Sequence, residues 1–160
     1  MNIGIVGARK YKDKQSVIDL VNSLPADSRI VTGTCKGPCV WAKEAAEARE
    51  MTLRLFAPDL KNIRGGKFEV AKRYYERNRQ MIMACDYLHA FVSEDGYVGG
   101  IRFEIQYALK LEIPVEVHFE DGKTERFPKY PFPFIDEKSK FMLSWQDFFC
   151  NTELNIGERL

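Results

Sequence analysis

The fold is decided by Tyr87–Val92 (YLHAFV) together with residues 95–108 (DGYVGGIRFEIQYA), which follow almost directly. The first segment is an apolar run with the length and bulky composition of a buried strand. The second begins with a glycine-rich turn and predicts a helix over residues 101–111. Glycines at a strand-to-helix turn allow the backbone to approach a ligand closely and present N–H groups to an anion. The carboxylate of Glu104 lies near the start of this helix.

The same strand, glycine loop and helix occur twice earlier in the chain. A strand at residues 3–6 ends in a first loop, residues 7–9 (GAR), and a helical stripe follows at residues 16–24. A second strand at residues 29–32 runs into Gly33-Thr34-Cys35-Lys36-Gly37 and then a helix over residues 40–49. Pro38 suits the first turn of that helix, where its missing N–H costs little.

Strands that alternate with helices predict a parallel sheet covered on both faces. Further strands are expected at residues 51–56 and 113–119, and a long helix at residues 68–84. We therefore predict an α/β, Rossmann-like sheet of order 3-2-1-4-5, in which the three glycine loops meet at the carboxyl edge.

Residues 1–119 are assigned to this Rossmann-like domain, and residues 120–160 to a hairpin and an aromatic extension of the same domain. Asp121-Gly122 favours a type I′ turn, which would return residues 124–127 as an antiparallel edge strand.

Composition excludes several classes of protein. The 160 residues suffice for one domain, and the formal net charge of +1 argues against bulk attraction to nucleic acid or anionic lipid. No apolar run approaches the roughly 20 residues that a membrane span needs, and residues 1–7 do not resemble a signal peptide. We expect a cytoplasmic protein without a cofactor.

No metal site is expected from the sequence. Cys35 and Cys39 lack the usual zinc spacing, and His89 and His118 fall inside predicted strands. The cysteines are expected to be reduced in a cytosolic chain.

Three segments resemble the SLOG superfamily of Rossmann-like nucleotide-binding proteins. Residues 7–9 are similar to its first-loop pattern, and residues 30–37 (IVTGTCKG) to its "VTGGARG" segment. Residues 76–81 (ERNRQM), followed by Cys85-Asp86, are similar to its "RNR-x-M … AD" helix. The superfamily includes the Lonely-Guy phosphoribohydrolases and the DNA-processing protein A domain.

A related resemblance is to nucleoside deoxyribosyltransferases and deoxynucleotide N-hydrolases, whose nucleophilic Glu lies in a "GxxxELGYA" context. Residues 103–108 (FEIQYA), followed by residues 113–115 (IPV), are close to that pattern. Together the resemblances cover about residues 1–119.

The resemblance implies a nucleotide-binding protein that hydrolyses the N-glycosidic bond of a nucleoside 5′-monophosphate. Glu104 matches the catalytic carboxylate, Arg77 matches the catalytic arginine, and Asp95 is a candidate acid for the departing base. The remaining candidate residues would bind the ligand: Gly7, Ala8, Arg9, Gly33, Thr34, Lys36, Gly37, Gly96, Tyr97, Gly99 and Gly100.

Several of these residues also have an alternative interpretation in which they contact no ligand. Glu104 can be an ordinary solvated residue of a helix start, and Arg77 part of a solvated helix face. Tyr97 either stacks on a base or covers its loop, and Lys36 either binds the ligand or points to solvent.

Departures from the family pattern define the alternative function. Gly99-Gly100 stands where relatives have Gly-Thr, and Gly33-Thr34 where they have Gly-Gly. The alternative is a non-catalytic sensor or sequestering protein for a nucleotide-derived ligand. A nucleic-acid-binding role is disfavoured by the net charge.

Relatives often pair through their helices, so we expect a homodimer or larger. The expected contact is the aromatic C-terminal segment: Phe132, Phe134, Phe141, Trp145 and Phe148.

Overall fold

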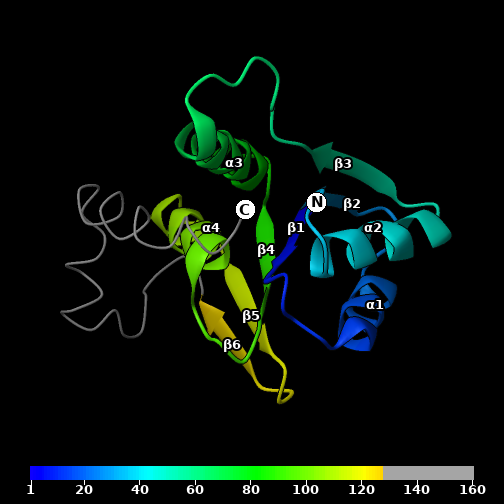
Figure 1. Ribbon diagram of the computed structural model, residues 1–160. Helices are drawn as coiled ribbons and strands as arrows, with labels where there is room; N and C mark the ends of the chain where they lie inside the picture. The colour runs from blue at the N-terminus through cyan, green and yellow to red at the C-terminus, as the bar shows by residue number, and fades with distance from the viewer. Residues whose placement is uncertain (128–160) are drawn as a thin grey trace.

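A computed structural model describes residues 1–127 and shows an α/β fold with a mixed sheet of order β3-β2-β1-β4-β5-β6 (Figure 1). The strands are β1 (Asn2–Gly7), β2 (Arg29–Gly33), β3 (Thr52–Phe56), β4 (Tyr87–Val92), β5 (Val115–Phe119) and β6 (Thr124–Phe127). The helices are α1 (Lys14–Ser23), α2 (Pro38–Ala48), α3 (Gly66–Met83) and α4 (Gly99–Lys110).

The predicted fold class and strand order are confirmed. All neighbouring strands pair in parallel except β5 and β6, which are antiparallel. The aromatic segment from Phe132 to Phe148, which we expected to form a subunit contact, lies outside the described residues.

Each face of the sheet has its own apolar core. On one face, Val17 and Val21 of α1 and Ala42 of α2 pack with Ile5 and Phe91. On the other face, α3 and α4 cover a second cluster, which includes Leu88, Ala90 and Val92 of β4. The alternation along β4 follows from the two-residue repeat of a strand, and it explains why this run is apolar apart from His89.

The helix ends differ slightly from the sequence-based expectations. α4 begins at Gly99 and not at Ile101, so the two glycines belong to its first turn. α2 begins at Pro38, the predicted first-turn residue.

The predicted type I′ turn between β5 and β6 is wrong. A type I′ turn needs positive φ at both central residues, but only Gly122 has it, at 83°. The Gly122 N–H donates to the Phe119 carbonyl at 3.1 Å, and the Phe119 N–H donates to the Lys123 carbonyl at 2.9 Å. This is the three-residue alternative, in which a turn is closed by a left-handed glycine. The antiparallel strand itself has the expected bounds.

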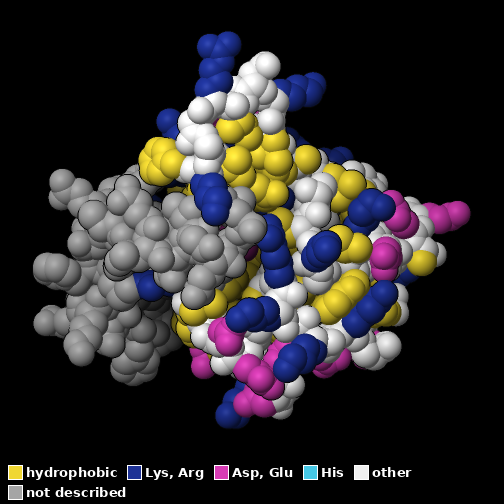
Figure 2. Space-filling view, viewed as in Figure 1, with side chains coloured by type: hydrophobic (Ala, Val, Ile, Leu, Met, Phe, Trp, Pro, Cys, Tyr) yellow, Lys and Arg dark blue, Asp and Glu magenta, His cyan; other side chains and the backbone are white. Residues whose placement is uncertain are grey.

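The exposed surface carries charges of both signs. On the face seen in Figure 2, Lys and Arg side chains are distributed over many elements, with Asp and Glu side chains among them. No helix within residues 1–127 is long and apolar enough to cross a membrane.

Gly7 ends β1 where α2 begins. A Cβ atom at Gly7 would lie 2.3 Å from Pro38 Cγ and 3.0 Å from Phe91 Cβ. The absence of a side chain therefore lets the start of α2 dock directly on the end of the central strand.

Replacing Gly7 by Ala should destabilise the protein by about 1–3 kcal/mol, the usual cost of overpacking a filled core. The measurement is the free energy of unfolding from urea titration. Thr52→Ala, an exposed change on edge strand β3, is the control and should cost less than about 1 kcal/mol. Equal stability of Gly7→Ala and the unmodified protein would contradict the docking described here.

Candidate functional site

The three glycine loops adjoin one another because β2, β1 and β4 are neighbours in the sheet. The Ala8 N–H donates to the Phe91 carbonyl at 2.9 Å, which ties the first loop to the end of β4. Gly37 has a φ of 86°, and a Cβ there would lie 3.3 Å from the Ala8 carbonyl oxygen. The Lys10 ammonium lies 2.9 Å from the Asp95 carboxylate, which links the first and third loops.

Arg77 is buried beneath the second loop, with 4 % of its surface exposed. Its Nη1 donates to the Phe56 carbonyl at 3.0 Å, and its Nε to Asn78 Oδ1 at 2.7 Å. Nη2 lies 3.1 Å from Cys35 Sγ. A Cβ at Gly33 would lie 2.3 Å from Nη1, so a side chain at residue 33 would displace the guanidinium from this position. The solvated-face interpretation of Arg77 is therefore wrong.

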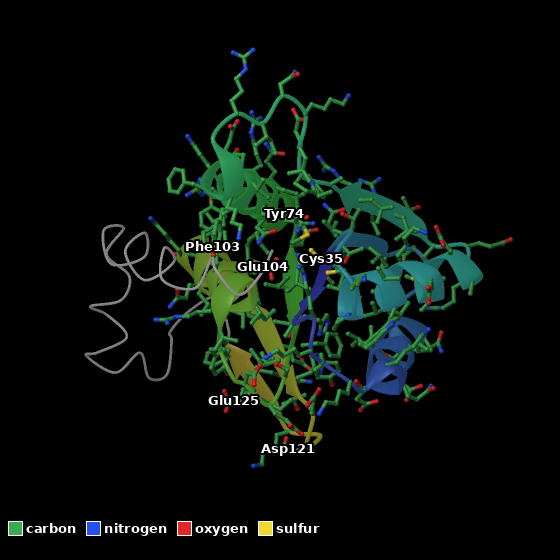
Figure 3. All side chains as sticks on the ribbon, viewed as in Figure 1. Cys35, Tyr74, Phe103, Glu104, Asp121 and Glu125 are labelled. Carbon is green, nitrogen blue, oxygen red and sulfur yellow. The ribbon has the colours of Figure 1, made fainter. Side chains whose placement is uncertain are left out.

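A second guanidinium lies on the same edge. The Cζ atoms of Arg9 and Arg77 lie 5.9 Å and 5.6 Å from the centroid of the Tyr74 ring. Arg9 Nη2 also approaches Cys35 Sγ at 3.9 Å. Figure 3 shows Tyr74 and Cys35 in this region, between α3 and the start of α2. Two positive charges around one aromatic ring are suited to binding an anion that carries a flat group.

Glu104 is the sixth residue of α4 and is only 7 % exposed, so it is not a solvated residue of a helix start. It lies three residues after Ile101 and four before Ala108, on the side of α4 that faces the sheet. Because α4 begins at Gly99, Glu104 is in its second turn, beyond the first turn in which the helix dipole acts most strongly.

Burial and the charge of Glu104 both influence the pKa of the Cys39 thiol. Burial, and then the nearby charge of Glu104, raise the pKa of the Cys39 thiol to about 11. Cys39 is in the first turn of α2, directly after the second glycine loop. Figure 3 shows Glu104 on the side of α4 toward Cys35, a residue of the second glycine loop.

The remaining candidate ligand-binding and catalytic residues lie nearer the surface, and two of them contact other surface side chains. The Asp95 carboxyl is about half exposed and paired with Lys10. The Tyr97 hydroxyl donates to Glu125 Oε2 at 3.1 Å, and its ring meets Phe119 edge-on. Two roles were considered for Tyr97, stacking on a base and covering its own loop. These contacts agree with the second role. Thr34 and Lys36 are exposed.

Sequence reasoning missed two residues of this site. Tyr74 lies one helical turn before Arg77, and that three-residue spacing was the available signal. Cys35 was considered only as a metal ligand, although its position inside the second glycine loop places it beside both arginines.

The class of protein defined by this geometry is a Rossmann-like α/β fold with a polar, glycine-lined carboxyl edge. No protein-family model matches the chain, and comparisons with curated proteins and with solved structures find no match.

Replacing Arg77 by Met keeps much of its volume but removes every donor. It should destabilise the protein by about 1–3 kcal/mol, because the partly buried Phe56 carbonyl and the buried Asn78 amide lose their partner. Urea titration measures the change. Arg9→Met, on an exposed residue, is the matched control and should change stability by less than about 0.5 kcal/mol. Equal effects of the two variants would contradict the structural role of Arg77.

The described cysteines should differ in reactivity toward an alkylating reagent at pH 8. Burial raises the pKa of Cys39 to about 11 and that of Cys85 to about 12, so neither forms much of the reactive thiolate. Cys35 is partly exposed and should be labelled first. Peptide mass spectrometry locates the label, and denatured protein, in which all sites react, is the control. Labelling of Cys39 as fast as Cys35 would contradict this arrangement.

Proposed function

We propose that the protein binds a nucleotide at the carboxyl edge of its sheet and hydrolyses the N-glycosidic bond of a nucleoside 5′-monophosphate. The observation that carries the proposal is the buried carboxylate of Glu104, set at the edge that also holds three glycine loops and two arginines. The resemblance of the loops to the SLOG superfamily, stated above, supports the same assignment.

Phosphate binding is assigned to the first and third loops. Gly99 and Gly100 form the first turn of α4, whose N–H groups have no partner within the helix and favour an anion. Arg9 is exposed at the end of β1 and supplies a positive charge. Binding energy gained at the phosphate would hold the sugar in place for the reaction.

Hydrolysis requires a group that stabilises positive charge on the sugar carbon C1′. The Glu104 carboxylate does this, either as an electrostatic partner or as a nucleophile. The C1′–N bond breaks, the base departs with its bonding electrons and a proton, and water supplies the hydroxyl at C1′. Asp95 is the proposed proton donor to the base.

Arg77 serves this site as a positioning residue. Its contacts with the Phe56 carbonyl and Cys35 Sγ hold α3 against the end of β3 and against the second loop, while its bond to Asn78 lies within α3. This assignment replaces the direct catalytic role that the family resemblance implies, because at least three of its five N–H donors are used within the protein.

A second candidate function, a non-catalytic sensor or sequestering protein, is favoured by one specific observation. Asp95, the proposed acid, is paired with Lys10 at 2.9 Å. This ion pair engages the proposed acid with a side chain of the first loop.

Glu104→Gln should reduce release of free base by at least about a hundredfold, the scale seen when one transition-state contact is lost. Purified protein is incubated with ribo- and deoxyribonucleoside monophosphates, and base is measured by chromatography. Glu47→Gln, an exposed carboxylate on α2 paired with Lys43, is the control and should keep full activity.

The same samples separate the two functions. Thermal stabilisation by nucleotides, ADP-ribose or cyclic nucleotides without base release would favour the sensor. Base release that persists unchanged in Glu104→Gln would overturn the catalytic role of Glu104. Failure of every ligand to stabilise the protein would overturn nucleotide binding itself. A homo-oligomeric state and a cytoplasmic location remain predictions from the sequence.

A further inference from the structure

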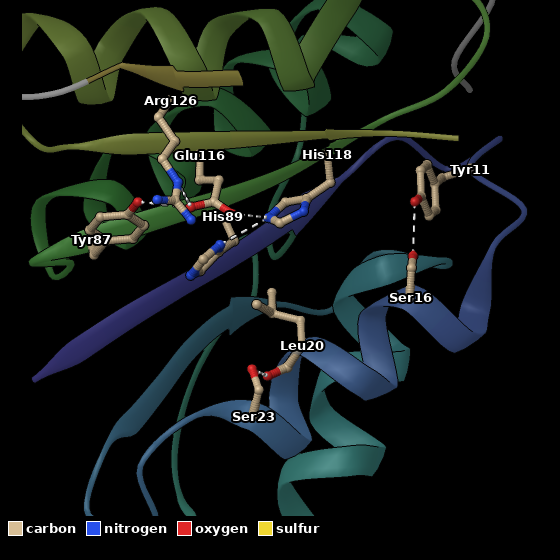
Figure 4. A network of polar contacts seen from close by, with 9 residues as sticks. All are labelled: Tyr11, Ser16, Leu20, Ser23, Tyr87, His89, Glu116, His118 and Arg126. Carbon is tan, nitrogen blue, oxygen red and sulfur yellow. Dashed lines mark hydrogen bonds and ion pairs between the residues drawn. The ribbon is translucent and has the colours of Figure 1, made fainter. Parts of the chain in front are cut away.

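The two histidines of the chain meet on the other face of the sheet from Glu104. His89 on β4 is the register partner of Glu116 on β5, and His118 follows two residues later on the same face of β5. Phe91, the register partner of His118, belongs to the core beneath α1 and α2. Figure 4 shows the three side chains gathered between the two strands.

The atoms of this cluster have the spacing of metal ligands. His89 Nδ1 and His118 Nε2 form a hydrogen bond of 3.0 Å, whose proton a bound metal ion would displace, and His118 Nε2 lies 3.8 Å from Glu116 Oε1. One ligand atom from each of the three residues lies within 4.8 Å of the others. Tetrahedral zinc with bonds of 2.0–2.1 Å separates its ligand atoms by about 3.3 Å. Small side-chain rotations would bring the cluster to that spacing.

The chemistry of the three side chains suits a cation. Burial lowers the pKa of both His89 and His118, because it disfavours the charged imidazolium. Although burial opposes ionisation of Glu116, the hydrogen bond from Arg126 favours the ionised form and lowers the pKa of Glu116. Neutral imidazoles and ionised carboxylates are the forms that bind metal ions.

Surrounding residues orient the three ligands. Glu116 Oε2 accepts hydrogen bonds from Arg126 Nε at 2.7 Å and from the Tyr87 hydroxyl at 3.2 Å, so Oε1 is the oxygen that faces His118. The His118 ring stacks on Phe91 with centroids 4.6 Å apart. Such outer contacts fix ligand orientation in metal sites. The Arg126 guanidinium bonds Oε2, the oxygen that does not face His118, and its side chain is largely exposed.

We infer that His89, Glu116 and His118 form a binding site for one divalent first-row transition-metal ion, with Zn²⁺ as the ion best suited to the ligand set. Two imidazoles and a carboxylate are a recurrent set for zinc and for iron. Three protein ligands leave a coordination position for water or another small ligand. The inference does not depend on the proposed nucleotide chemistry, because the cluster and Glu104 lie on different faces of the sheet.

The first test uses the unmodified protein. Protein purified without a histidine tag and treated with a chelator is titrated with Zn²⁺ while the two histidine side chains are followed by NMR. Both imidazole signals should change together and saturate at one metal ion per chain. Histidine signals that do not respond to Zn²⁺ would overturn the inference.

Variants then identify the ligands. Cobalt(II) serves as the spectroscopic probe, because thiolate ligation adds an intense near-ultraviolet band that nitrogen and oxygen ligands lack. His118→Gln and Glu116→Gln should each weaken Co²⁺ binding at least tenfold. Thr124→Gln, at the β6 register partner of His118, is the matched control and should leave binding unchanged. Circular dichroism checks that each variant is folded.

The spectra decide between histidine and cysteine sites. A spectrum without a thiolate band, lost in the folded ligand variants, supports the site. A thiolate band, or affinity unchanged in both folded ligand variants, overturns it. If a ligand variant fails to fold, the NMR titration of the unmodified protein decides alone.

Discussion

The candidate site depends on the fit of the Arg77 guanidinium beneath Gly33. Arg77 Nη1 occupies the space that a Cβ at residue 33 would need, and the guanidinium bonds the end of β3, its own helix and the second loop. A buried charge is tolerated only when its donors are satisfied. The same contacts that stabilise Arg77 therefore also hold α3, β2 and β3 together at the edge where a ligand would bind.

Strand β4 contributes to both proposed sites, because its side chains point alternately to the two faces of the sheet. In β4, Leu88, Ala90 and Val92 face the core beneath α3 and α4, the helices that carry Arg77 and Glu104. His89 and Phe91 face the other way, toward α1 and the cluster with Glu116 and His118. The sheet thus separates a proposed nucleotide edge from a proposed metal site by a single layer of backbone.

Much of the fold could be predicted from local patterns. Apolar runs, glycine turns and helical stripes indicated every described strand and helix, and the alternation of elements indicated the strand order. The predictions were wrong locally, at positions where the same residues are compatible with two backbone geometries. Asp121-Gly122 is compatible with two hairpin geometries, and the choice depends on how the bonds around Phe119 and Lys123 close. The start of α4 at Gly99 was missed because glycine weakens a helix pattern.

By itself, the sequence determined the fold class, the strand order and the three loops that meet at one edge, because these follow from residue periodicity and turn chemistry. Only the tertiary structure decided which side chains are buried together. It showed that Arg77, a catalytic candidate whose alternative was a solvated helix face, is buried, and it placed the Tyr74 ring near two guanidinium groups. It also brought His89 beside His118, 29 residues apart in the chain. Parallel pairing of β4 with β5 makes these two residues neighbours. No local sequence pattern encodes the register of two strands that a helix separates in the chain.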